Sequence, residues 1–275
     1  MTRRAGAERI AMIGYGAIGM EISGALDRLG ETDRLVATLV RAGRSAPKAV
    51  FDNAGLLAAR PDCVIECAGH EAAVAFAPDL LRAGVDVILS SVGILADPAN
   101  VRAICDAEQA GGGRALLPAG AIAGLDGLIA ASLAGTDTVT YTSCKPPHAW
   151  RGTPAENLID LNHEEDEVVF FEGTAREAAA NYPKNANVAV AVGLSGIGLD
   201  RTRVRLVSSR KVADPLGIIE AEGAFGRFHF DILALAAKSN PKTSALTAYS
   251  LLQCARLGCA LPIGELIRSK DRRMG

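Results

Sequence analysis

Three glycines with the spacing Gly-x-Gly-x-x-Gly lie near the start of the chain, at Gly14, Gly16 and Gly19. They follow a short apolar run, residues 9–13, and precede a helix-like segment, residues 20–29. In such a loop the first glycine permits a tight turn, the second lets a pyrophosphate approach the backbone, and the third lets the helix pack against the strand. The start of the helix adds free N–H groups and a partial positive charge. This order of strand, loop and helix predicts a dinucleotide site. Its backbone contacts would come from Gly14, Gly16, Ala17, Ile18 and Gly19.

Arginines occupy the end of the second predicted strand, where folds selective for NAD usually carry an acid. That acid lies about 20 residues beyond the glycine loop and binds the ribose 2′-hydroxyl. This chain has Val40-Arg41-Ala42-Gly43-Arg44 there, and two guanidinium groups suit a 2′-phosphate. The sequence therefore favours NADP, or the use of both cofactors. The alternative is that Arg41 and Arg44 are solvated loop charges.

The composition is typical of a globular enzyme that acts on small molecules. The chain has 275 residues, of which 49% are hydrophobic, and a formal net charge of -2. This balance provides no basic field for nucleic acid or an anionic membrane. No apolar run reaches about 18 residues, and no cleavable apolar segment follows Arg3 and Arg4. We therefore expect a cytoplasmic protein.

The six cysteines are scattered and form no Cys-x-x-Cys pair, which is typical of reduced thiols in the cytosol. Cys63 and Cys67 flank a predicted strand, but no further His or Cys pair completes four metal ligands, so no metal site is expected. The six are Cys63, Cys67, Cys105, Cys144, Cys254 and Cys259.

Strand-like and helix-like segments alternate through the first 120 residues. The alternation is typical of βαβ units around a parallel sheet and predicts an N-terminal Rossmann domain with a doubly wound sheet over residues 1–120. The predicted strands after the first are residues 34–40, 63–67, 85–89 and 114–117, and the helices are residues 54–59, 71–83 and 100–110.

The pattern changes near residue 121, where strands with alternating polarity become frequent. This predicts a second α/β domain, residues 121–240, with a mixed and largely antiparallel sheet. A helix over residues 243–257 would return within a segment, residues 241–275, to pack on the first domain. The predicted strands are residues 138–143, 167–171, 203–206 and 227–232, and the helices are residues 122–134, 175–180 and 187–194.

Seven short segments, taken in order, resemble the L-aspartate dehydrogenase family over nearly the whole chain. They are Glu66-Cys67-Ala68-Gly69-His70, Ser91-Val92-Gly93, residues 118–126, Lys145-Pro146-Pro147, Asn185-Ala186-Asn187-Val188, Gly223-Ala224-Phe225-Gly226 and residues 240–244. The resemblance implies a Rossmann domain joined to an α/β domain whose open sheet shapes the substrate site and a homodimer interface. It also implies that NAD(P) oxidises the amine of L-aspartate. The product, iminosuccinate, hydrolyses to oxaloacetate and ammonia or feeds the quinolinate branch of NAD synthesis.

The resemblance also places cofactor contacts in both domains. The Ala121 backbone and Asn187 match cofactor-contact positions, and we add Ala68 and Gly69 after the third strand. Gly120 belongs to a loop of small residues that permits close approach to the nicotinamide end, or forms a hinge turn. Asn187 offers an amide donor and acceptor, but it could equally cap the helix that follows.

The segment Asn240-Pro241-Lys242-Thr243-Ser244 places two hydroxyls and an ammonium at a predicted helix start. This is an arrangement that binds carboxylates, and it is also an ordinary capped helix terminus. We assign Asn240, Thr243 and Ser244 to the substrate and Lys242 to catalysis.

The chain departs from the family at the catalytic histidine, whose position holds Gly217. Glycine cannot accept a proton, so another group must replace the histidine or the activity has changed. His148, on a proline turn beside a basic residue, is the leading candidate, with a surface histidine as its alternative. His70 could lie beside the nicotinamide or merely begin a helix. We expect His163 in a solvated acidic turn and His229 in a structural strand.

Two other functions stay open at this point. The chain could be an oxidoreductase of a related amino or imino dicarboxylate or a semialdehyde, for which Cys144 would be the plausible covalent nucleophile. It could also be a non-catalytic homologue that kept its cofactor cleft.

Overall fold

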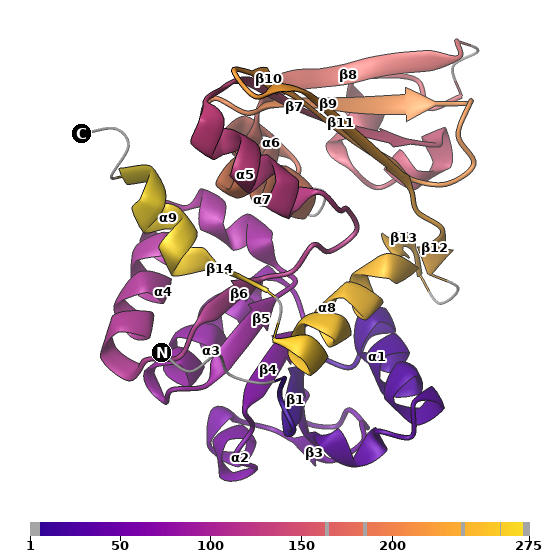
Figure 1. Ribbon diagram of the computed structural model, residues 1–275. Helices are drawn as coiled ribbons and strands as arrows, with labels where there is room; N and C mark the ends of the chain where they lie inside the picture. Colours follow the sequence, from indigo (N-terminus) through magenta and orange to yellow (C-terminus); the bar gives the residue numbers. More distant parts are fainter. Residues whose placement is uncertain (1–5, 163–164, 184–185, 238–239, 259, 272–275) are drawn as a thin grey trace. The chain divides into compact units, whose positions relative to one another are not determined.

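The computed structural model describes residues 6–162, 165–183, 186–237, 240–258 and 260–271 (Figure 1). The chain divides into two compact units. The first combines Met1–Gly120 with Thr247–Gly275, and the second is Ala121–Leu246. The first unit is therefore built from two stretches of chain that are far apart in the sequence.

A sheet of seven strands forms the centre of the first unit. Its order is β14-β6-β5-β4-β1-β2-β3, and all neighbours are parallel except β14, which is antiparallel to β6. The order from β3 to β6 is that of a Rossmann fold, which confirms the predicted doubly wound sheet. The strands are β1 (Ile10–Ile13), β2 (Leu35–Leu39), β3 (Ala49–Val50), β4 (Cys63–Glu66), β5 (Asp86–Leu89), β6 (Ala115–Leu117) and β14 (Leu261–Pro262).

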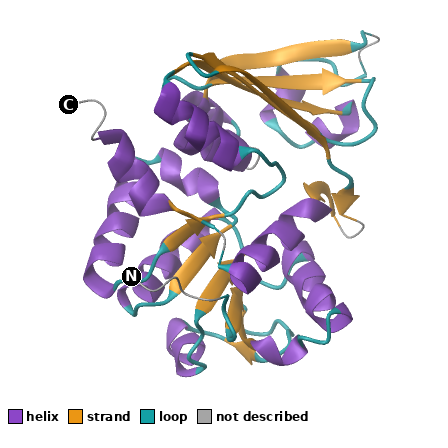
Figure 2. Cartoon of the chain, viewed as in Figure 1, coloured by secondary structure: helices purple, strands orange, loops and turns teal. Residues whose placement is uncertain are grey.

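Helices cover both faces of this sheet (Figure 2). The ends of α4 illustrate why they form where they do. Asp97 accepts a hydrogen bond from the Ala99 N–H at its start, Pro98 takes the first turn, and Gly112 ends it in a left-handed conformation. The helices are α1 (Ala17–Arg28), α2 (Asn53–Ala58), α3 (His70–Arg82), α4 (Pro98–Gly111), α8 (Ala245–Leu257) and α9 (Ile263–Asp271), with short 3₁₀ helices η1 (Thr32–Arg34) and η2 (Val92–Ala96).

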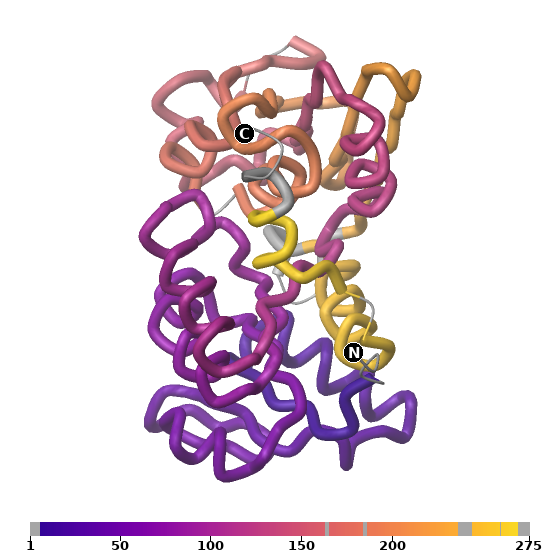
Figure 3. Tube along the Cα trace, turned by 60° about the vertical axis from the view of Figure 1, so that its left-hand side comes forward, coloured from indigo at the N-terminus to yellow at the C-terminus, as the bar shows by residue number. Residues whose placement is uncertain are grey.

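The core of the first unit joins the two distant stretches of chain. Ile10 and Met12 of β1 share one buried cluster with Leu251 and Leu252 of α8. The Ala7 N–H donates to the Ala255 carbonyl at 2.8 Å, and Figure 3 shows the N-terminal segment running beside α8. Burial of large apolar side chains on both elements stabilises this pairing.

The second unit is a five-stranded sheet with helices on one face (Figure 2). Its order is β11-β10-β7-β9-β8, in which β7 and β9 are parallel and all other neighbours are antiparallel. This confirms the predicted mixed and largely antiparallel sheet. The strands are β7 (Thr136–Lys145), β8 (Glu167–Thr174), β9 (Arg203–Ser209), β10 (Leu216–Gly223) and β11 (Gly226–Leu233), and the helices are α5 (Leu125–Ala134), α6 (Ala175–Asn181) and α7 (Asn187–Ser195).

Shorter elements complete the second unit. They are the 3₁₀ helices η3 (Pro147–Trp150) and η4 (Pro154–Asn157) and the hairpin of β12 (Ala236–Ala237) and β13 (Asn240–Ser244). Two predicted helix starts are wrong by a few residues. The helix expected from residue 122 begins at Leu125, after Gly124 in a left-handed conformation, and the helix expected from residue 243 begins at Ala245, after β13.

Over the residues described, none of the helices has the length and apolar character that a membrane crossing requires.

Candidate cofactor and substrate site

A cavity of about 1020 Å³ opens in the first unit where β1, β2 and β4 end. This is the point at which the strand order reverses, and ligands of open α/β sheets bind there. The cavity brings together four of the predicted cofactor residues, namely Gly14, Gly16, Arg41 and Ala68. It also includes residues that were not predicted, among them Ser45, Phe51, Cys67, Glu71 and Phe76.

The glycine loop has the geometry that a pyrophosphate requires. Gly14 has φ +96°, and a Cβ there would lie 2.9 Å from the Ala68 Cα. A Cβ on Gly19 would lie 2.7 Å from the Gly14 carbonyl oxygen. A Cβ on Gly16, in contrast, would meet nothing within 4 Å, so this residue borders open space at the start of α1. The loop therefore fits a dinucleotide, with Ala17, Ile18 and Gly19 in the first turn of α1 supplying N–H groups.

Cys67 ties the loop after β4 to the glycine loop. Its thiol lies 3.3 Å from the Ile13 carbonyl oxygen and 3.5 Å from that of Gly14, to which it donates. Burial raises the pKa of the Cys67 thiol well above its ordinary value, which keeps it protonated and able to donate. Cys67 is therefore a structural support of the cavity.

The two arginines after β2 lie on the cavity wall. Arg41 and Arg44 are exposed and line the cavity together with Ser45. The described lining has one carboxylate, Glu71, which belongs to the first turn of α3 and does not follow β2. The wall after β2 thus has the donors of a phosphate site, and its selectivity for NADP stays a prediction.

The remaining predicted positions of the first unit lie close to this edge of the sheet. Gly69 has φ +113° and precedes His70, which is the first residue of α3. The Gly120 N–H donates to the Ser250 hydroxyl at 2.9 Å. His70 thus does begin a helix, and a role beside the nicotinamide is not tested by this placement.

In the second unit, a rigid turn holds His148. The turn is η3, and its Trp150 is fully buried and donates its indole N–H to the Val207 carbonyl at 3.0 Å. The Lys145 ammonium lies 4.7 Å from the centre of the Trp150 ring, a cation–π distance. The His148 side chain is exposed at this fixed position. The catalytic role of His148 stays a prediction.

Gly217 lies in β10, opposite Ser143 of β7. A Cβ at Gly217 would lie 3.3 Å from the Ile122 Cδ1 and 3.7 Å from the Tyr141 hydroxyl. Burial raises the pKa of Tyr141 to about 12, so this hydroxyl is neutral at physiological pH. The position that the resemblance matches to the family's histidine is therefore next to an aliphatic and a phenolic side chain.

Other candidates of the second unit have more ordinary surroundings. Ser244 accepts a hydrogen bond from the Leu246 N–H at 3.1 Å and so caps α8. Asn187 is the first residue of α7, and Ala186 is its N-cap. Burial raises the pKa of the Cys144 thiol, which disfavours a nucleophilic thiolate. His229 lies exposed in β11, with its Nδ1 3.6 Å from a Glu220 carboxylate oxygen.

Several predicted residues have no described side chain. The backbone of β13 includes Asn240, Lys242 and Thr243, whose side chains lie outside the described part. His163 also lies outside the described residues.

The predicted cofactor position Ala121 is described, and it is the first residue of the second unit.

Comparison with known proteins identifies the family. Residues 14–118 match the model "Homoserine dehydrogenase, NAD binding domain", and residues 126–257 match "Aspartate dehydrogenase, C-terminal". The L-aspartate dehydrogenase of Ruegeria pomeroyi is 46% identical over 90% of this chain and 91% of that protein. The chain belongs to the L-aspartate dehydrogenase family. This confirms the resemblance inferred from the sequence segments.

Two further proteins similar to this chain are also aspartate dehydrogenases. The enzyme of Pseudomonas aeruginosa is 41% identical over 89% of this chain and 95% of its own length. The crystal structure of aspartate dehydrogenase from Thermotoga maritima superposes with a TM-score of 0.70 at 25% identity, covering 90% of this chain and 95% of that one. Because the NAD-binding model spans the glycine loop, the cofactor is NAD or NADP, and the residues around the cavity fit it.

Sequence reasoning missed the aromatic residues of the cavity. Phe51 follows β3 and is 59% exposed, and Phe76 lies on α3. No strand was predicted before Phe51, because β3 has only two residues, so its position beside the cavity had no signal in the sequence. Nothing in the sequence indicated that residues 51 and 76 share a wall with Gly14, because their proximity follows from the order of the strands.

Proposed function

We propose that this chain oxidises L-aspartate with NAD(P)⁺ to iminosuccinate, which hydrolyses to oxaloacetate and ammonia, or performs the reverse reductive amination. The observation that carries the proposal is the 46% identity to an L-aspartate dehydrogenase over 90% of the chain. The cavity around the glycine loop supports it, because amine oxidation needs a bound nicotinamide.

The chain's residues have distinct tasks in this proposal. NAD(P)⁺, when bound, would supply the hydride acceptor. The N–H groups at the start of α1 bind the pyrophosphate, and Gly16 leaves room for it. His148 accepts the proton of the substrate ammonium, from a turn that the buried Trp150 anchors. Asn240, Thr243 and Ser244 bind the substrate carboxylates, and Lys242 takes part in catalysis.

We further propose a preference for NADP over NAD. Arg41 and Arg44 lie on the cavity wall after β2, where a 2′-phosphate would be bound by two guanidinium groups. Ala68, Gly69, Gly120, Ala121 and Asn187 complete the cofactor contacts.

We propose a cytoplasmic homodimer that feeds iminosuccinate to NAD synthesis. The thiols of Cys63, Cys67 and Cys144 form no disulfide, which supports a reducing compartment. The dimer rests on the family resemblance, and the molar mass in solution tests it.

The experiment that tests the function follows cofactor absorbance with purified protein, oxaloacetate, ammonia and either NADPH or NADH. Consumption of the reduced cofactor that requires both oxaloacetate and ammonia supports the proposal. A His148→Ala variant with the same cofactor affinity and a much lower kcat identifies the base. Absence of turnover with both cofactors, at high enzyme concentration, contradicts aspartate as the substrate.

Gly217 favours a second candidate, an oxidoreductase of a related amino or imino dicarboxylate or a homologue that binds the cofactor without turnover. The lack of a side chain at this position is the observation in its favour. Turnover of another amino dicarboxylate with no turnover of aspartate supports the first form. Cofactor binding with no turnover of any amino acid supports the second.

A further inference from the structure

Glu66 is the last residue of β4, and its side chain is fully buried. One carboxylate oxygen, Oε1, accepts the N–H groups of Ala68 at 2.8 Å and Gly69 at 2.9 Å. The same oxygen lies 3.1 Å from the Ser91 hydroxyl, and Oε2 accepts the Ser91 N–H at 3.0 Å. Three backbone N–H groups and one hydroxyl thus converge on a single buried carboxylate.

This arrangement requires a reason, because burying a carboxylate is unfavourable unless hydrogen bonds replace its water. Glu66 joins two loops that are 25 residues apart in sequence, one after β4 and one after β5. Both loops leave the carboxyl edge of the sheet, where the cofactor cavity opens. The carboxylate therefore determines the position of backbone at the edge of the binding site.

The loop after β4 contacts both the cavity and the glycine loop. Ala68, held through its N–H by Glu66, lines the cavity and packs so closely on Gly14 that a Cβ there would lie 2.9 Å away. Cys67, which lies between Glu66 and Ala68 in the sequence, donates a hydrogen bond to the Gly14 carbonyl. A shift of this loop would therefore move both a wall of the cavity and the glycine turn.

We propose that Glu66 is a positioning residue for the dinucleotide. It fixes Ala68, Gly69 and Ser91, and through Ala68 and Cys67 it holds the glycine loop in the conformation that receives the pyrophosphate. The proposal depends on cofactor binding and not on the identity of the substrate. Failure of the aspartate assay would therefore leave it testable.

The neighbouring strand offers a matched control. Asp86, the first residue of β5, is also buried and accepts the Arg114 N–H at 2.9 Å along with the Arg114 guanidinium. It lies at the amino edge of the same sheet, at the opposite end of the strands from the cavity. The substitution Asp86→Asn therefore disturbs the hydrogen bonds of a buried carboxylate in the same unit, at the end of the sheet away from the cofactor cavity.

The test compares Glu66→Gln with Asp86→Asn in the full chain. The quantities measured are the Kd of NADPH and NADH from cofactor fluorescence, and Tm. In Glu66→Gln an amide NH₂ faces at least one N–H donor, so a charge-assisted hydrogen bond is lost. We expect the Kd to rise roughly tenfold to a hundredfold, the equivalent of one such bond. Asp86→Asn should lower Tm and change the Kd less than about twofold.

Two results would overturn the proposal: an unchanged Kd in Glu66→Gln, or an equal rise in both variants, which would mean general loss of stability. If Glu66→Gln does not fold, the Kd of Ser91→Ala tests the proposal instead. This variant removes the hydroxyl donor to Glu66 and keeps its three backbone N–H donors. A Kd raised about threefold or more in Ser91→Ala supports the proposal, and an unchanged Kd contradicts it.

Discussion

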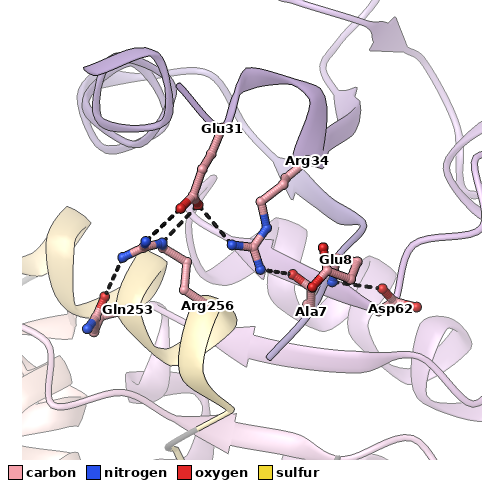
Figure 4. Close-up of polar contacts among 7 residues, drawn as sticks. All are labelled: Ala7, Glu8, Glu31, Arg34, Asp62, Gln253 and Arg256. Carbon is pink, nitrogen blue, oxygen red and sulfur yellow. Dashed lines mark hydrogen bonds and ion pairs between the residues drawn. The ribbon is translucent and has the colours of Figure 1, made fainter. Parts of the chain in front are cut away.

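Arg256 of α8 binds Glu31 through two hydrogen bonds, from Nε to Oε2 at 2.9 Å and from Nη2 to Oε1 at 2.6 Å (Figure 4). Arg34 donates to the same carboxylate at 2.8 Å, and Gln253 accepts from Arg256 at 3.1 Å. Glu31 follows α1, so this cluster fastens a helix from the end of the chain to an element from its beginning, within the first unit.

The cluster predicts an acid-dependent loss of stability. Hydrogen bonds from Arg256 and then Arg34 lower the pKa of Glu31 to about 2 from its usual 4.5. Because the folded pKa lies below the unfolded one, the contribution is complete above about pH 4.5 and is lost as the pH falls towards 2. The Tm of the wild type should exceed that of Glu31→Gln at pH 6, and the two should converge near pH 2. A gap that is independent of pH would contradict the assigned pKa.

Substitutions at two glycines should separate cofactor binding from stability. Gly16→Ala adds a methyl into open space at φ -85°, so Tm should change little while the Kd of the cofactor rises at least about tenfold. Gly19→Ala forces a Cβ within 2.7 Å of the Gly14 carbonyl oxygen and should lower stability by about 1–3 kcal/mol. Thermal unfolding and cofactor titration check both. A large fall in Tm for Gly16→Ala would show that the space is not open.

Gly217→His should raise kcat if the family's histidine has simply been lost. Only Ile122 must move, by a few tenths of an ångström, to accept a Cβ at this position. A positioned general base contributes typically 10²–10⁴-fold, so a rise of at least about tenfold in the rate of aspartate oxidation would show that the base had been lost and would contradict the role proposed for His148. Gly217→Ala is the control, because it adds the Cβ without the imidazole. Equal rates in the two variants are the result that we expect, because His148 is the proposed base.

Removal of the arginines after β2 should change cofactor selectivity. Arg41→Ala combined with Arg44→Ala deletes both guanidinium groups from the cavity wall, so the KM for NADPH should rise roughly tenfold or more. The KM for NADH should change less than about twofold, because NADH lacks the 2′-phosphate. Steady-state kinetics with both cofactors decide the matter. An equal change for the two cofactors would indicate that the arginines act as solvated charges.

The fold class and the glycine loop could be predicted from the sequence because their signals are local. The apolar run before Gly14 and the helix after Gly19 lie within about one βα unit. β10 gave no comparable signal, since glycine, alanine and glutamate disfavour strands. It forms because β7 and β11 pair with it on both sides. Tertiary pairing therefore determined an element that local preference did not.

The support of the candidate site was equally hidden from sequence reasoning. The carboxylate of Glu66 reaches Ser91 only because β4 and β5 are neighbours in register, with Glu66 opposite Leu89. Such a contact depends on the packed sheet and not on spacing along the chain. The glycines could be found from their pattern, whereas the residues that hold them could be found only from the structure.

The division of the first unit between Met1–Gly120 and Thr247–Gly275 also bears on how the chain is synthesised. When a ribosome has released the first 120 residues, β1 still lacks Leu251 and Leu252, which share its buried cluster. The second unit consists of one continuous stretch, so it can fold before the chain is complete. During that time the first unit lacks α8, and the apolar surface of β1 stays exposed. The nascent cofactor-binding unit therefore exposes apolar surface until the C-terminal stretch has been synthesised, and this surface requires protection from aggregation.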